Sequence, residues 1–112
     1  MEENRARYDL QIYKGATYRK TAWFKQNGKP FDLTGYTAAA QIRPSVNSDI
    51  LTSDIACEID LAAAAVSLGL SAEQTALLPA GIQEWDLKMI DQNGNVAYYV
   101  YGKVFITGRV TE

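Results

Sequence analysis

The stretch that decides the fold is residues 70–81, with the sequence LSAEQTALLPAG. Ser71 is a favourable N-cap, and Gln74 follows three residues later as the second member of a capping box. Pro79 and Gly81 end the helix after about two turns, because proline cannot continue a helix and glycine favours its termination. A helix this short cannot form a core layer. We therefore predict a crossover helix over 71–78 that connects two β-sheets.

The composition favours a binding or structural domain over an enzyme. Of the 112 residues, 47% are apolar, so the chain has enough apolar side chains for one core of ordinary size. It contains no histidine, the residue most often used as a general base and as a metal ligand. Cys57 is the only cysteine, which excludes an internal disulfide and a thiolate zinc site. We therefore expect no enzymatic activity, no cofactor and no bound metal.

Charge and hydropathy narrow the expected partners. The formal net charge is −2 and charged residues are mixed along the chain, so the sequence does not favour nucleic acid as a partner. Apolar runs are shorter than a membrane span requires, and the first residues lack the apolar run of a signal peptide. One free cysteine is typical of a protein made in a reducing cytoplasm. We expect neither a membrane anchor nor a secretion signal.

Short alternating segments separated by turn residues make up most of the chain. Strands are expected near residues 8–13, 17–26, 36–43, 55–59, 65–70, 82–91 and 96–107. Turns are expected at Asn27-Gly28, 62–65 and 92–95, and a polar loop over 45–53 in which Ile50-Leu51 pairs briefly as an edge strand. Seven or eight short strands with one short helix predict an all-β fold, an immunoglobulin-like antiparallel β-sandwich.

The alternation also predicts which side chains form the core. Over residues 82–91, Trp85 and Leu87 face one way while Glu84 and Asp86 face the other. Applied to every strand, this pattern predicts two antiparallel sheets that bury Tyr18, Phe24, Ile42, Leu70, Trp85, Leu87, Val100 and Val104.

Residues 8–112 are expected to form this single domain, with residues 1–7 as an N-terminal arm. The arm, MEENRAR, carries charges of both signs and has no periodicity, which is typical of a frayed terminus. A neighbouring subunit would hold such an arm in place. Arg5 and Arg7 are then the candidates to pair with carboxylates on that neighbour.

The last strand carries the main candidate interface. If Val100 and Val104 face the core, then Tyr99, Tyr101 and Phe105 share the opposite face. A soluble monomer seldom exposes several aromatic side chains in one row. Either the arm or the 45–53 loop covers these three residues, or they contact another subunit, together with Trp23, because aromatic residues are enriched at interface cores.

The candidate metal and catalytic patterns have simpler explanations in turn chemistry. Residues 91–95, DQNGN, have oxygen-bearing side chains at alternate positions, as in half of a calcium loop. No glutamate follows at the bidentate position, and an Asn-Gly turn already accounts for the sequence. We therefore predict neither a metal ligand nor a catalytic residue.

A series of motifs along the chain carries a family resemblance: YDL at 8–10, YKGATY at 13–18, FDLTGYTA at 31–38, QIR at 41–43, LSAE at 70–73, LPAG at 78–81 and WDL at 85–87. In this order they resemble small tailed-phage virion proteins that have an Ig-like sandwich and are associated with the baseplate and tail fibres. The layout is similar to that of the N-terminal domain of phage baseplate upper proteins. The resemblance covers nearly the whole chain and brings no catalytic residues.

The resemblance implies a non-enzymatic structural component of a tailed-phage virion. It would be made in the host cytoplasm and located in the tail or baseplate, where it mediates fibre attachment or tail assembly. Its partners would be other virion proteins, arranged with it in many symmetric copies. Two alternatives stay open: a capsid decoration or cement protein, and a carbohydrate-binding module that stacks sugars on Trp23, Tyr99 and Tyr101.

Overall fold

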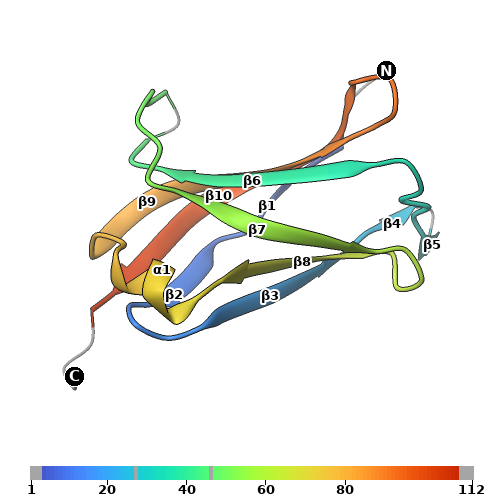
Figure 1. Cartoon of the computed structure of the whole chain (residues 1–112). Coiled ribbons are helices and arrows are strands. Elements are labelled where there is room, and N and C mark those ends of the chain that lie inside the picture. The colour runs from blue at the N-terminus through green and yellow to red at the C-terminus, as the bar shows by residue number, and fades with distance from the viewer. Residues whose placement is uncertain (1–3, 27, 46, 109–112) are drawn as a thin grey trace.

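The computed structural model describes residues 4–26, 28–45 and 47–108, which form an all-β fold with one short helix (Figure 1). The elements in chain order are β1 (Asn4–Arg7), β2 (Leu10–Tyr13), β3 (Tyr18–Trp23), β4 (Lys25–Gln26), β5 (Lys29–Pro30), β6 (Thr37–Arg43), β7 (Ser53–Asp60), β8 (Ala65–Leu70), α1 (Ala72–Ala76), β9 (Gly81–Ile90) and β10 (Val96–Thr107). The predicted sandwich-like all-β class is confirmed. None of the described residues belongs to a helix long and apolar enough to cross a membrane.

The two layers of the sandwich belong to one curled sheet. The strand order is β1-β10-β9-β6-β7-β8-β3, with β2 also paired to β10 and with β4 and β5 as a separate hairpin. Strand β7 joins the layers, because residues 53–55 pair with β6 and residues 56–60 pair with β8. The prediction of two separate sheets is therefore wrong in this respect. A single strand long enough to bend can pair on one side with each layer in turn.

The sheet is mixed, whereas the sequence predicted only antiparallel pairs. β1 and β2 both lie along one edge of β10 and run parallel to it. Asn4–Arg7, expected as an arm outside the domain, thus supplies an edge strand of the sheet. The pairing joins residues about a hundred positions apart in the chain, and no turn signal in the sequence reports such a contact.

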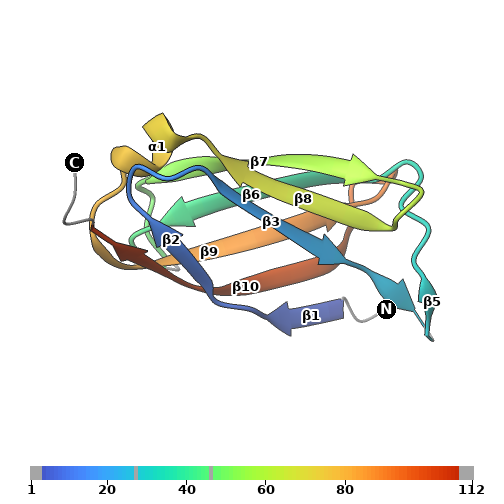
Figure 2. The same cartoon turned by 90° about the horizontal axis from the view of Figure 1, so that it is seen from below.

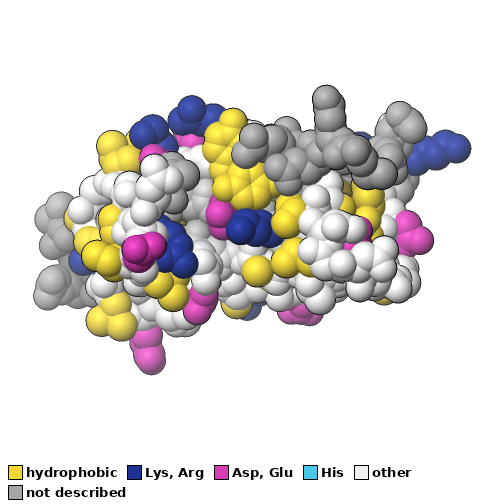
Figure 3. Space-filling model, turned by 90° about the horizontal axis from the view of Figure 1, so that it is seen from above, with side chains coloured by type: hydrophobic (Ala, Val, Ile, Leu, Met, Phe, Trp, Pro, Cys, Tyr) yellow, Lys and Arg dark blue, Asp and Glu magenta, His cyan; other side chains and the backbone are white. Residues whose placement is uncertain are grey.

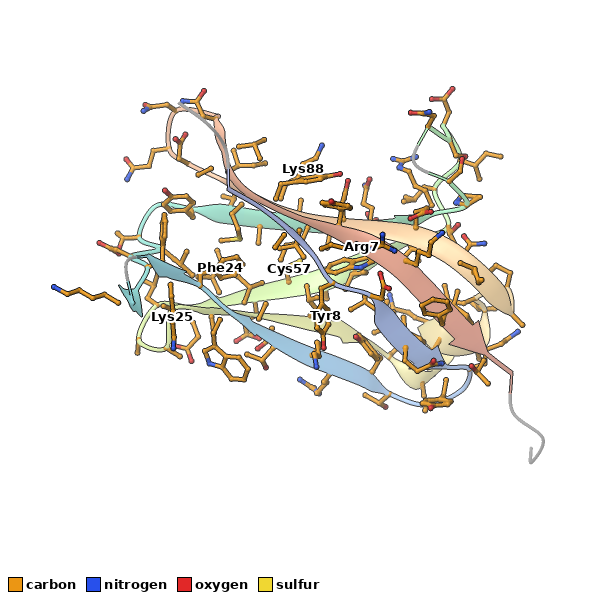
Figure 4. All side chains as sticks on the ribbon, turned by 180° about the vertical axis from the view of Figure 1, so that it is seen from behind. Arg7, Tyr8, Phe24, Lys25, Cys57 and Lys88 are labelled. Carbon is orange, nitrogen blue, oxygen red and sulfur yellow. The ribbon has the colours of Figure 1, made fainter. Side chains whose placement is uncertain are left out.

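The core lies between the two layers, whose strands Figure 2 shows from below. Of the eight predicted core residues, seven are buried, among them Ile42, Trp85 and Leu87. Tyr18 is only half-buried, although it packs against the core cluster, because β3 pairs with β8 alone and forms an edge of the sheet. Phe24 and Cys57 point into the space between the layers (Figure 4).

Helix α1 crosses from β8 to β9 and so passes from one layer to the other (Figure 1). The predicted capping box is present: the Gln74 backbone N–H donates to Ser71 Oγ at 3.1 Å, and the Ser71 N–H donates to Gln74 Oε1 at 2.8 Å. The helix is shorter than the predicted 71–78. Its buried Thr75 hydroxyl accepts from the Gly15 N–H at 3.0 Å and donates to the Ala16 carbonyl at 2.8 Å, which fixes the helix to the β2–β3 turn.

A sharp corner at Tyr8 and Asp9 separates β1 from β2. The Tyr8 N–H donates to the Tyr101 carbonyl at 2.9 Å, and the Trp85 indole Nε1–H donates to the Tyr8 carbonyl at 2.7 Å. The Lys103 N–H donates to Asp9 Oδ1 at 2.9 Å, and this bond is the main reason why the pKa of Asp9 is lowered. Gly102 faces the corner, where a Cβ atom would come within 2.7 Å of the Tyr8 carbonyl carbon.

The turns and loops follow the sequence predictions with one exception. Gly28 lies in the β4–β5 hairpin, while Asn27, the other half of that predicted turn, is outside the described residues. Residues 91–95 connect β9 to β10, and Gly28 and Gly94 have positive φ, as tight turns require. Ile50 and Leu51 were expected to form a short edge strand, and this is wrong: both lie in the loop before β7 and are exposed. The backbone contact with β6 is made by Thr52 instead, whose N–H donates to the Ile42 carbonyl at 2.8 Å.

Candidate interaction surface

The outer face of the layer formed by β1, β10, β9 and β6 collects most of the predicted interface residues. Paired residues on neighbouring strands share a face, so the register sorts them into rows. Arg5 pairs with Tyr99, and Arg7 pairs with Tyr101. On the other side of β10, Tyr101 pairs with Asp86 and Phe105 pairs with Ile82. The register therefore brings four of the six candidates, Arg7, Tyr99, Tyr101 and Phe105, to one face, which we call the outer face.

Alternation along β10 follows the predicted pattern. Val100, Val104 and Ile106 are buried, whereas Tyr101 is 40% exposed and Tyr99 and Phe105 are half-buried on the opposite side. The Gln11 side chain reaches from β2 across to β10, where its Nε2 donates to the Phe105 carbonyl at 3.1 Å. β1 lies beside β10 in the same layer and so leaves Tyr101 exposed.

Tyr99 and Tyr101 lie side by side on the outer face. Their rings stack with centroids 5.8 Å apart and planes inclined by 22°. The Tyr99 hydroxyl donates to Asp86 Oδ2 on β9 at 3.2 Å. Two adjacent rings held by stacking and by a hydrogen bond lose little further conformational freedom when a partner covers them.

A shallow depression of about 360 Å³ lies next to the tyrosines, and its lining includes Gln41, Arg43, Glu84, Asp86, Tyr99 and Tyr101. Hydrogen bonds position its polar groups: Arg43 Nη2 donates to Gln41 Oε1 at 2.9 Å, and Gln41 Nε2 donates to Asp54 Oδ1 at 3.1 Å. Figure 3 shows this side of the molecule, where hydrophobic side chains alternate with charged ones. The depression thus combines aromatic surface with fixed polar groups of both charge signs.

Charged residues border the apolar part of the outer face. Lys103 Nζ lies 3.5 Å from Glu84 Oε1, and Lys88 points away from the core (Figure 4). The Arg7 side chain is 56% exposed and its Nε lies 3.4 Å from Asp9 Oδ1. An exposed pair of this length contributes little to stability, so the guanidinium remains accessible to a further carboxylate. The Arg5 side chain lies outside the described part of the structure.

Trp23, the sixth candidate, does not belong to this surface. It lies on β3 in the opposite layer, where it pairs with Ala65 of β8, and it is 66% exposed. A single sugar or protein surface therefore does not meet Trp23 together with Tyr99 and Tyr101 on one flat platform. Alternation along a strand predicts which of its side chains are exposed, but it does not predict the layer to which the strand belongs.

Two side chains with possible metal or thiol chemistry serve structural roles. Asp91 Oδ1 accepts the backbone N–H groups of Asn93 and Asn95, both at 2.9 Å, which is turn chemistry. Burial raises the pKa of the Cys57 thiol to about 11, so the thiol is protonated at neutral pH. Among the residues that the structure describes, no three His, Cys, Asp or Glu side chains are grouped as a metal site would need.

Sequence analysis missed the depression beside the tyrosines. Glu84 and Asp86 were placed correctly on the outward side of their strand, but nothing connected them to Gln41 and Arg43. The register supplies that connection, because Gln41 pairs with Asp86 and Arg43 pairs with Glu84. Alternating polar residues in both segments were the available signal, and they become a site only once β6 is known to lie next to β9.

Comparisons with known proteins support the fold. No family model and no curated protein sequence matches the chain. The N-terminal domain of phage TP901-1 ORF48 superposes with a TM-score of 0.57 over 95% of this chain and 98% of that domain, at 12% identity. The chain shares its fold with a phage protein domain. The internalin-like protein lmo2027 of Listeria monocytogenes superposes with a TM-score of 0.52 at 12% identity; the match covers 94% of this chain but only 28% of that protein. At this identity, each likeness shows the fold alone.

Proposed function

We propose that this protein is a non-enzymatic structural component of a tailed-phage virion and that its outer face binds another virion protein. The observation that carries the proposal is the stacked pair Tyr99–Tyr101 beside a depression with fixed polar groups. The similarity of the fold to a phage domain over nearly the full length of both supports it. The tail or baseplate is the proposed location, as the motif order implies.

The composition of the outer face fits a protein interface. Tyrosine provides a large contact area with few rotatable bonds, and aromatic residues dominate binding energy at interface centres. Phe105 and Ile82, which pair across β10 and β9, extend the apolar area. Exposed Arg7 at the rim provides a charge for orienting the partner, because rim charges mainly affect the rate and specificity of association.

Occupancy in particles tests this proposal. The double variant Tyr99→Ser/Tyr101→Ser should remain folded and should be lost from purified particles of the phage whose genome encodes the protein. The matched control is Leu61→Ser/Leu77→Ser, which also removes two exposed apolar side chains, 56% and 87% exposed, but from turns outside the outer face. Mass spectrometry of purified particles measures the occupancy, and thermal unfolding of each isolated variant measures its stability.

Two outcomes would contradict the proposal. Normal occupancy of the tyrosine variant would show that the partner binds elsewhere, and equal loss of both variants would show a general effect of removing apolar surface. Separating tails from capsids before the measurement distinguishes a tail or baseplate component from a capsid decoration protein.

A carbohydrate-binding module is the second candidate, and the depression favours it. Stacked aromatic rings next to carboxylate and amide groups provide both a surface for a sugar ring and partners for its hydroxyl groups. Screening the protein against an array of bacterial surface glycans tests this function. Binding that disappears in Tyr99→Ser/Tyr101→Ser, with particle occupancy unchanged, would favour this candidate over the first.

A further inference from the structure

The curled sheet does not close on itself. β1 and β3 are the two ends of the strand order, and each pairs on one side only within the described residues. Figure 2 shows β3 diverging from β2 after the turn that joins the two strands. Between these elements lies a depression of about 360 Å³, which we call the open seam. Residues 6–8 line one side of it, residues 20–24 line the other, and Leu68, Trp85 and Val100 form its floor.

The backbone of β3 has hydrogen-bonding groups that point into the open seam. The Phe24 N–H donates to the Ala64 carbonyl at 2.8 Å, on the side of β8. Backbone groups alternate sides along a strand, so those of Arg19, Thr21 and Trp23 point the other way, toward the seam. No strand of the described chain pairs with this edge. A free edge of this length is a template for an additional strand.

The floor and the rim of the open seam differ in chemistry. The floor is apolar, since Leu68, Trp85 and Val100 are core residues that are no more than 8% exposed. Arg7 and Lys20 are the charged residues in the lining, which includes no carboxylate-bearing residue. Lys20 Nζ lies 5.0 Å from the centroid of the Tyr8 ring, across the seam from its own strand. Figure 4 shows Arg7 and Tyr8 on their side of the opening.

We propose that the open seam binds an extended acidic segment of a partner protein, which adds to β3 as a further β-strand and places one large apolar side chain on the seam floor. Main-chain hydrogen bonds to Arg19, Thr21 and Trp23 provide the attachment, as in other cases of strand addition. Carboxylates of the segment meet Arg7 and Lys20. A second copy of β3 does not fit this edge, because Arg19 and Lys20 of both copies would lie close together. This site shares Arg7 with the rim of the outer face, but it does not depend on a partner being bound there.

The test uses the full chain and two synthetic eight-residue peptides. In the first, glutamate alternates with valine and one central phenylalanine; in the second, lysine replaces every glutamate. The acidic peptide should bind and slow amide hydrogen exchange at Arg19, Thr21 and Trp23. The lysine peptide should bind at least about tenfold more weakly. Binding is followed by Trp fluorescence and the exchanging amides by NMR.

Two variants make the test specific. Thr21→Pro removes an N–H that faces the seam and leaves the pairing with β8 intact, so it should abolish binding; Thr21→Val is its matched control. Ala22→Leu fills the seam without changing the edge, and it should weaken binding about tenfold or more if the proline variant fails to fold.

Several results would overturn the proposal. These are equal binding of the two peptides, no binding of either at millimolar concentration, and unchanged binding of the acidic peptide to a folded Thr21→Pro or Ala22→Leu variant. In those cases β3 is an edge that Lys20 protects against pairing. Self-association of a Lys20→Val variant would support that reading.

Discussion

Replacing Gly102 with Ala tests the most demanding contact in the structure. Gly102 lies on β10 opposite Trp85, and the Tyr8–Asp9 corner passes directly over it. A Cβ atom at this position would contact the Tyr8 carbonyl oxygen, lie 2.7 Å from its carbon and lie 2.8 Å from Asp9 Oδ1. Two of these three atoms belong to the backbone and cannot rotate away. The corner must therefore move off β10.

The expected loss of unfolding free energy follows from the hydrogen bonds that the Tyr8–Asp9 corner makes. Three hydrogen bonds of 2.7 to 2.9 Å converge there: Trp85 Nε1–H to the Tyr8 carbonyl, the Tyr8 N–H to the Tyr101 carbonyl, and the Lys103 N–H to Asp9. Each contributes about 1 kcal/mol net, and a methyl group forced into a filled space adds about 1–3 kcal/mol. An edge strand relaxes in part, so we expect the free energy of unfolding to fall by about 2–4 kcal/mol. The Tm should fall by about 8–16 °C.

Gly69→Ala is the matched control for this prediction. Gly69 also lies within a strand, but its nearest neighbour to a new Cβ atom is the Tyr18 carbonyl oxygen at 3.8 Å, an ordinary contact. We expect Gly69→Ala to change stability by less than about 0.5 kcal/mol. Urea unfolding of the three proteins measures the difference. Equal stability of the two variants would refute the argument, as would a destabilised Gly102→Ala in which NMR shows the Trp85 indole N–H still hydrogen-bonded.

Three further predictions concern the helix and the titrating groups. Ser71→Ala removes the capping side chain of α1 and should lower the free energy of unfolding in urea by about 1 kcal/mol. Thr75→Val keeps the shape of a fully buried side chain but leaves the Gly15 N–H without its acceptor; calorimetry should show a loss of about 1–3 kcal/mol. Burial raises the pKa of Cys57 to about 11 and of Tyr18 to about 12, from ordinary values of 9.0 and 10.0. Both groups ionise first in the unfolded chain, so their contribution to stability should be fully present at neutral pH and should be lost between pH 9 and 12; a flat urea midpoint over that range would contradict this.

Local chemistry in the sequence predicted the elements that depend on neighbouring residues. The capping box at Ser71 and Gln74, the Asn93-Gly94 turn and the alternation around Trp85 each involve contacts within a few positions. The structure has all three of them. The outward side of Tyr99, Tyr101 and Phe105 followed for the same reason, since alternation within one strand decides it.

Long-range pairing could not be predicted in this way. The sequence predicted that β1 belongs to an arm and that β2 is an ordinary strand, because nothing in residues 4–13 indicates that β10 lies beside them. For the same reason, the sequence did not predict the depression between β6 and β9, and it placed Trp23 on the same surface as Tyr99 and Tyr101. Gly102 was the one local sign of the corner, since a glycine within a strand often marks a close backbone approach.

The direction of the first strands determines how the domain would carry a mechanical load. β1 and β2 run parallel to β10, with four register pairs each, and β1 begins where β10 begins. Tension applied through the two ends of the chain would pull β1 backward and β10 forward along their shared edge. All the hydrogen bonds between them would then be sheared together instead of being peeled apart in sequence. If neighbouring subunits hold the domain at both ends, force must break this whole set at once before the chain extends.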